Sequence, residues 1–170
     1  LELIEATSAR QVQMLREQRI DVGVVIPPVF EADDMRLQAF DRDHLSIALP
    51  RAHPLAQRKH LTIAALADEP FVLWPAREGR GFHSQVVRLC AAAGFTPEVV
   101  QEAHGMHAVL SLVAVEAGIS VVPASMAGFR DAEVVYRPIS GDEAAFELHL
   151  CLRAGEASPA VVNFARNVAS

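Results

Sequence analysis

The chain has 170 residues, of which 51% are hydrophobic and 21% are charged. This composition excludes a disordered chain and suits one large domain or two small lobes. The formal net charge of −6 argues against a surface that grips duplex DNA, because such surfaces are normally basic.

The first quarter of the chain predicts a strand, a helix and a second strand. Residues 1–4 are strand-like, and they open the chain without an initiator methionine, so we expect a fragment of a longer protein. Ser8 followed by Gln11 has the spacing of a capping box, which predicts a helix with Ser8 as its N-cap. Residues 20–26 are rich in β-branched side chains and predict a buried parallel strand that ends at Pro27.

Strands and helices continue to alternate along the remainder. In chain order, we expect a strand at 45–49, a short helix at 63–67, a strand at 71–74, a helix at 82–93, a strand at 99–100, a helix at 106–117, strands at 119–122, 134–136 and 146–152, and a helix at 159–168. Gly118 is expected to take the left-handed conformation that ends a helix. The alternation predicts the α/β class with mostly parallel sheets.

The two cysteines, Cys90 and Cys151, lie far apart among apolar neighbours and outside any C-x-x-C pattern. We expect buried, inert thiols in a reducing compartment, with a redox pair as the alternative. No apolar run approaches the roughly 20 residues that span a bilayer, so we expect no membrane partner.

Four motifs follow one another along the chain. They are Ser8-x-x-Gln11 leading to IDVG at 20–23, LPRAHPLA at 49–56, LADEPFV at 66–72 and LVAVEAGISVVPAS at 112–125. Together, and in this order, they resemble the effector-binding domain of LysR-type transcriptional regulators.

The resemblance implies a periplasmic-binding-protein-like fold of type 2, in which two crossing strands join two α/β lobes around an effector cleft. Lobe one would comprise residues 1–41 and 139–170, and lobe two residues 42–138. The family also carries an N-terminal helix-turn-helix that is absent from this chain. The resemblance therefore implies a cytoplasmic regulator that contacts DNA through that absent part and forms a homodimer or homotetramer at full length.

The first helix and second strand supply two candidate ligand contacts. Free N–H groups at a helix N-terminus attract anions, and in the family the position of Ser8 often holds Ser or Thr facing the cleft. A purely structural cap is the alternative. Ile26 ends a strand, where strand C-termini border the crevice of doubly wound sheets, and core packing is its alternative.

The loop at 75–81 supplies further candidates, namely Pro75, Ala76, Arg77 and Arg80. Arginine pairs with carboxylates through two parallel hydrogen bonds, and glycines in this loop let backbone approach a ligand. The resemblance matches it to a cleft-lining loop, especially in the branch that senses acids from aromatic catabolism. Two solvated surface arginines are the alternative.

His104 and His107 lie three apart at the start of a helix, a spacing that can serve a metal. No cysteine or carboxylate pattern joins them, so we expect no metal and no cofactor. The resemblance instead suggests that Met106 and His107 contact the ligand.

No catalytic constellation is present. Ser84 follows His83 directly, and adjacent residues of a helix do not face each other. Ser125 lacks the G-x-S-x-G elbow. We therefore expect no enzyme but a sensor of a small organic anion, such as a carboxylate, within a LysR-type regulator. The alternative is a solute-binding protein of a transport system with the same fold.

Overall fold

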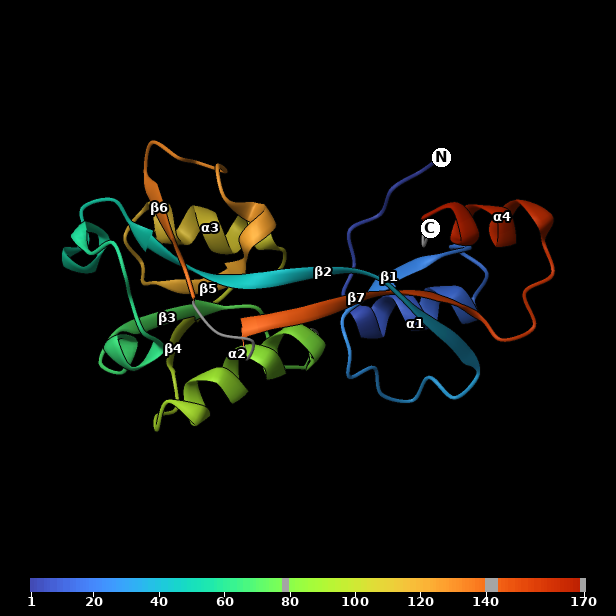
Figure 1. Ribbon diagram of the computed structural model, residues 1–170, viewed down its shortest axis with the longest axis horizontal. Coiled ribbons are helices and arrows are strands. Elements are labelled where there is room, and N and C mark those ends of the chain that lie inside the picture. The colour runs from blue at the N-terminus through green and yellow to red at the C-terminus, as the bar shows by residue number, and fades with distance from the viewer. Residues whose placement is uncertain (78–79, 140–143, 169–170) are drawn as a thin grey trace. The chain divides into compact units, whose positions relative to one another are not determined.

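The structure, a computed structural model, describes residues 1–77, 80–139 and 144–168, and it leaves out the side chain of Arg80. Elements of the α/β class alternate along the chain, as the sequence predicts (Figure 1). In order they are α1 (Ser8–Arg16), β1 (Gly23–Val25), β2 (Met35–Pro50), the short 3-10 helices η1 (Pro54–Gln57) and η2 (Ile63–Leu66), β3 (Pro70–Leu73), α2 (Arg80–Ala92), β4 (Glu98–Glu102), α3 (Met106–Ala114), β5 (Ser120–Pro123), η3 (Ala124–Met126), β6 (Val134–Pro138), β7 (Ala145–Arg153) and α4 (Pro159–Val168).

The chain divides into two compact units. Unit one comprises Leu1–Arg42, Arg77–Phe82 and Glu147–Ser170, and unit two comprises Asp43–Ala76 and His83–Phe146. Strands β2 and β7 each supply residues to both units, and they are neighbours in the strand order β1-β7-β2-β5. No helix within the described ranges is long and apolar enough to cross a membrane.

This division differs from the expected lobes at residue 42, at 77–82 and at 139–146. Ile139 is buried and its amide donates to the Leu45 carbonyl at 3.4 Å, which extends the pairing of β6 with β2 inside unit two. The functional boundaries of the lobes, at 1–41 plus 139–170 and 42–138, stay a prediction.

In unit one, a pair of antiparallel strands, β1 and β7, carries a helix on each face. Successive side chains of a strand point to opposite faces. Cys151 of β7 packs with Leu15 of α1, whereas Leu150 of β7 packs with Ala165 of α4. Helices α1 and α4 accordingly lie on opposite sides of the strands (Figure 1).

The side chain of Gln11 ties α1 to β1. Its Nε2 donates to the Val24 carbonyl and its Oε1 accepts from the Val24 amide, both at 2.8 Å, as a neighbouring strand would do. The expected capping box is wrong by one residue. Thr7 is the N-cap of α1 and accepts from the Arg10 amide at 3.2 Å, which leaves Ser8 as the first helical residue.

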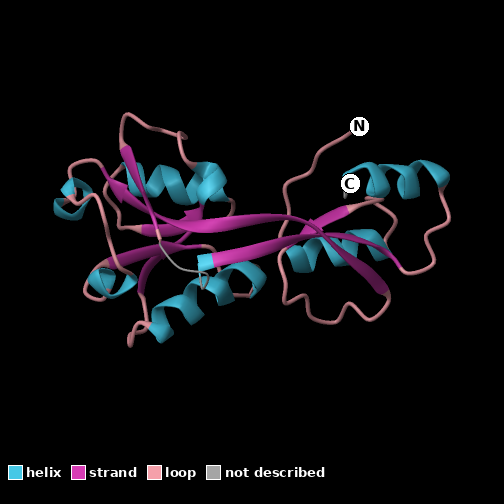
Figure 2. Cartoon of the chain, viewed as in Figure 1, coloured by secondary structure: helices cyan, strands magenta, loops and turns pink. Residues whose placement is uncertain are grey.

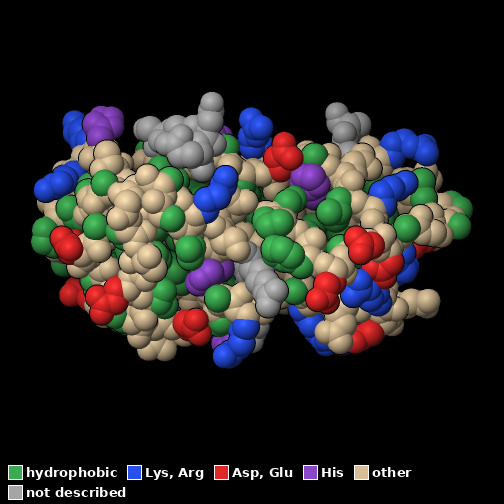
Figure 3. Space-filling view, turned by 90° about the horizontal axis from the view of Figure 1, so that it is seen from below, with side chains coloured by type: hydrophobic (Ala, Val, Ile, Leu, Met, Phe, Trp, Pro, Cys, Tyr) green, Lys and Arg blue, Asp and Glu red, His purple; other side chains and the backbone are tan. Residues whose placement is uncertain are grey.

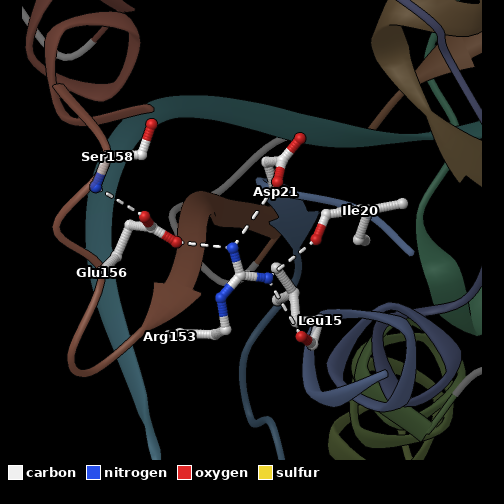
Figure 4. Close-up of polar contacts among 6 residues, drawn as sticks. All are labelled: Leu15, Ile20, Asp21, Arg153, Glu156 and Ser158. Carbon is white, nitrogen blue, oxygen red and sulfur yellow. Dashed lines mark hydrogen bonds and ion pairs between the residues drawn. The ribbon is translucent and has the colours of Figure 1, made fainter. Parts of the chain in front are cut away.

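Arg153, the last residue of β7, holds the other end of α1 (Figure 4). Its Nη1 donates to the carbonyl oxygens of Leu15 and Ile20, each at 3.0 Å. Its Nη2 donates to Glu156 at 2.5 Å and lies 3.5 Å from Asp21. Because the last carbonyls of a helix have no partner within it, this guanidinium stabilises the C-terminal end of α1.

Unit two contains strands β2, β5 and β6, which pair antiparallel, and strands β3 and β4, which pair parallel. The expectation of mostly parallel sheets is therefore wrong, because a run of buried β-branched residues does not specify strand direction. Helix α3 packs against this layer of strands, and α2 lies on its other side (Figure 2). One core cluster of this unit consists of alanines, valines and one leucine, namely Ala48, Val72, Ala103, Val109, Leu110, Val113, Val122 and Val134.

Two local expectations are corrected. The first four residues form no strand, and Leu1 and Leu3 are exposed. Gly118 does not supply the left-handed conformation after α3, because Glu116 takes it, with φ 63°. Gly118 is needed instead for a close approach, since a Cβ there would lie 2.7 Å from the Pro70 carbonyl oxygen.

Gly118→Ala is expected to destabilise unit two by about 1–3 kcal/mol, because the backbone of Pro70 must shift to admit the methyl group. Gly155→Ala is the matched control, since a Cβ at Gly155 meets no atom within 4 Å. The measurement is urea unfolding of both variants. Equal midpoints for the two variants would contradict the steric argument.

Glu156 is expected to make folding stability depend on pH. The hydrogen bond from the Ser158 amide, and then that from Arg153, lower the pKa of Glu156 below its ordinary 4.5. The stabilisation is therefore present above about pH 4.5 and is lost as the pH falls through the lower folded-state value. In thermal melts, Glu156→Gln should lower Tm at neutral pH and lessen the fall of Tm in acid. Glu2→Gln, at an exposed glutamate of the same unit, should leave both unchanged.

Candidate functional site

A pocket of about 220 Å³ lies within unit one. Its described lining comprises eight residues from the start of α1, the loop after β1, the loop before α2 and the start of α2, namely Ser8, Ala9, Pro28, Val29, Phe30, Glu31, Arg77 and Gly81. Pockets for drug-sized ligands measure about 300–1,000 Å³, so this one suits a smaller metabolite.

The N-terminus of α1 forms the polar side of the pocket. Ser8 and Ala9 carry the first amides of the helix, which have no partner within it and attract negative charge. The Ser8 hydroxyl accepts from the Ile26 amide at 3.1 Å, and its own proton can be donated to a ligand. The structure thus brings Ser8 and Ile26 together, with Ile26 engaged through its backbone.

Arg77 and Gly81 place the start of α2 in the same pocket. Gly81 is buried, and a Cβ there would overlap the carbonyl oxygen of Ile26. The glycine expected to admit a ligand thus admits the end of β1 instead. Arg77 is exposed and lines the pocket, so it and Ser8 are the two expected contacts that share this cavity.

The other residues of the 75–81 loop are placed differently. Pro75 is buried and Ala76 is exposed, and both belong to unit two. Arg80 is the first residue of α2, and its side chain lies outside the described residues.

Met106 and His107 begin α3 in unit two. Met106 packs against the core of that unit. The exposed ring of His107 meets Phe129 edge to face, with the ring centroids 4.7 Å apart. Both contacts support the fold whether or not these residues also bind a ligand.

The sequence did not single out the loop at 28–31. It follows β1 directly and supplies half of the pocket lining, including Phe30, which is 54% exposed. The signal available was the Pro27-Pro28 pair, which breaks the strand at the edge where doubly wound sheets bind ligands. The candidate ligand contacts expected from this part of the sequence ended at Ile26 and did not include the loop.

The LPRAHPLA motif has a structural explanation in unit two. His53 accepts from the Leu55 amide through Nδ1 at 3.2 Å, and its Nε2 lies 3.1 Å from Glu69. This histidine therefore caps η1 and fastens it to the segment before β3. His53 and Glu69 also line a second cavity of about 220 Å³.

Within the ranges that the structure describes, no three His, Cys, Asp or Glu side chains are placed to hold a metal ion. Cys90 and Cys151 are free and buried, which confirms the expected burial. Burial raises the pKa of each thiol to about 11.

Charged side chains of both signs are mixed on the face that Figure 3 shows. On the face in Figure 3, the described Lys and Arg side chains lie among acidic and apolar ones and form no continuous basic patch. This mixed distribution of charge agrees with the net charge of −6, and this face is not the continuous basic surface that binds duplex DNA.

Two α/β units that share a pair of neighbouring strands, with a ligand-sized pocket at a helix N-terminus, define a small-molecule-binding domain. The chain matches the LysR substrate binding domain over residues 1–170 and belongs to that family. Its fold is the periplasmic-binding-protein-like fold of type 2 found in LysR effector-binding domains.

The relatives are transcriptional regulators rather than enzymes. The HTH-type transcriptional regulator AlsR of Bacillus subtilis is 29% identical over 164 residues, which cover 96% of this chain and 54% of AlsR. The chain thus spans about half the length of the curated relatives it matches.

Solved structures of the family superpose closely. The LysR family regulator CbnR is 25% identical, with a TM-score of 0.83 over 99% of this chain and 59% of CbnR. The BenM effector binding domain with its effector benzoate is 26% identical, with a TM-score of 0.77 over 98% of this chain and 77% of that domain.

Gly81→Ala is expected to disrupt the pocket, because the added methyl group forces the Ile26 carbonyl and the start of α2 apart. The variant should lose about 1–3 kcal/mol of stability, measured by urea unfolding. Gly155→Ala serves again as the control with open space. Wild-type stability in Gly81→Ala would show that the close approach does not hold this corner of the pocket.

Proposed function

We propose that this protein senses a small organic carboxylate in the unit-one pocket. The observation that carries the proposal is that one small cavity combines the first amides of α1, the Ser8 hydroxyl and Arg77. Amides at a helix N-terminus and a guanidinium both favour an anion, and neither needs a metal to do so. The benzoate bound by BenM is itself a carboxylate, which supports this ligand class.

The proposal extends to the whole regulator. AlsR is named as a helix-turn-helix regulator and is about twice as long as this chain. We propose that the complete protein acts in the cytoplasm and binds DNA through a separate helix-turn-helix domain, as a homodimer or homotetramer. The effector regulates it by binding one conformation more tightly than another, since a ligand of equal affinity for both shifts nothing.

The pocket explains only part of the expected contact set. Direct effector contacts by Pro75, Ala76, Arg80, Met106 and His107 stay predictions.

The test is calorimetry with small carboxylates, amino acids included, each paired with its primary amide. The carboxylates should bind and the amides should bind at least about tenfold more weakly, since an amide cannot replace the charge-assisted hydrogen bonds. Ser8→Ala and Arg77→Gln should each weaken carboxylate binding by about tenfold. Arg166→Gln removes an exposed arginine from α4 and is the matched control for charge. Binding of the amides but not of the acids would overturn the proposal.

A further inference from the structure

The unit-one pocket contains a second charge that a simple carboxylate does not match. Among its described lining residues, Arg77 is basic and Glu31 is acidic, so the charges of the lining cancel. A ligand with only a carboxylate could contact Arg77 and Ser8 but would add a second negative charge to a cavity of about 220 Å³ that Glu31 also lines. Two like charges in one small cavity repel each other and so weaken binding.

Glu31 is held in place by its backbone. It has φ 53°, in the left-handed region that residues other than glycine rarely adopt. A guanidinium nitrogen of Arg16 donates to the Glu31 carbonyl oxygen. The same guanidinium donates to both carboxylate oxygens of Asp34, at 2.8 Å and 2.6 Å. The end of α1 thereby fixes the loop that brings Glu31 to the pocket.

Among the described residues, the guanidinium of Arg16 gives its hydrogen bonds to groups other than the Glu31 carboxylate. Arg16 is the nearby cation, and the hydrogen bonds of its guanidinium go to Asp34 and to the Glu31 backbone. Asp33 and Asp34 share the field of Arg16 with Glu31, so three carboxylates face one guanidinium. With Asp33 and Asp34 near Glu31, this side of the pocket favours a cationic group on the ligand, whereas the side of Ser8 and Arg77 favours an anionic one.

We propose that the ligand is zwitterionic, a small amino acid or related amino carboxylate, with its carboxylate at Ser8 and Arg77 and its ammonium at Glu31. The apolar side chains of Pro28, Val29 and Phe30 then take the hydrocarbon part. This inference rests on the proposed function, because it assigns a second group to the same carboxylate ligand.

The experiment compares pairs of ligands that differ only in the amino group. Leucine is set against 4-methylpentanoate and phenylalanine against 3-phenylpropanoate, by calorimetry at neutral pH. The amino acid of at least one pair should bind about tenfold more tightly than its partner. Glu31→Gln should remove that preference, chiefly by weakening the amino acid.

Asp33→Asn is the matched control, because Asp33 is exposed, neighbours the same arginine and does not line the pocket. Asp33→Asn should keep the preference for the amino acid over its partner. Thermal melts should show that Glu31→Gln and Asp33→Asn both stay folded. If the acids without an amino group bind as tightly as the amino acids, and Glu31→Gln leaves the ratio unchanged, the zwitterion proposal is overturned while carboxylate sensing stands. If no carboxylate of either kind binds while neutral amides do, carboxylate sensing fails as well.

Discussion

The hydrogen bonds of the Arg153 guanidinium hold the elements of unit one together. The guanidinium binds the carbonyl oxygen of Leu15, at the end of α1 where the helix dipole favours a cation, and that of Ile20 in the segment that follows α1. It also binds Glu156, in the segment that leads into α4. One side chain therefore joins the end of β7 to α1 and to the segment that leads into α4. Helix α1 carries Ser8 at its opposite end, so the orientation of the polar side of the pocket follows from a contact made away from it.

A second arginine at the same helix end acts on the opposite wall of the pocket. Arg16 grips Asp34 with two hydrogen bonds, and that contact lowers the pKa of the Asp34 carboxyl. Through the Glu31 carbonyl it also sets the loop after β1. The two ends of α1 thus have separate tasks. Its first turn carries amides at the pocket that have no partner within the helix, and its last residue holds the loop that also lines the pocket.

The order of elements was predictable because apolar periodicity and the positions of Gly and Pro mark where elements begin and end. Helix α4 has the expected bounds. The misses arise where several residues are locally equivalent and a distant contact decides. Thr7 and Ser8 can both cap a helix, and the bond from the Ile26 amide to Ser8 decides which one does. The first half of β2 does show the apolar and polar alternation of a strand, from Met35 to Ala39, but none of its residues before Leu45 is buried and the expected strand began only at Leu45. Glu31 belongs to no motif, and only the fold brings it to the pocket.

Because both native thiols are buried, this protein can be labelled with a fluorophore at a single introduced cysteine. Cys90 and Cys151 are buried, and their high pKa keeps them protonated and unreactive near neutral pH. A single cysteine introduced on the exposed loop after β1 would then be the one thiol that accepts a fluorophore. Wild-type cysteines need not be removed, so the core that they fill stays intact while the dye reports on the occupancy of the neighbouring cavity.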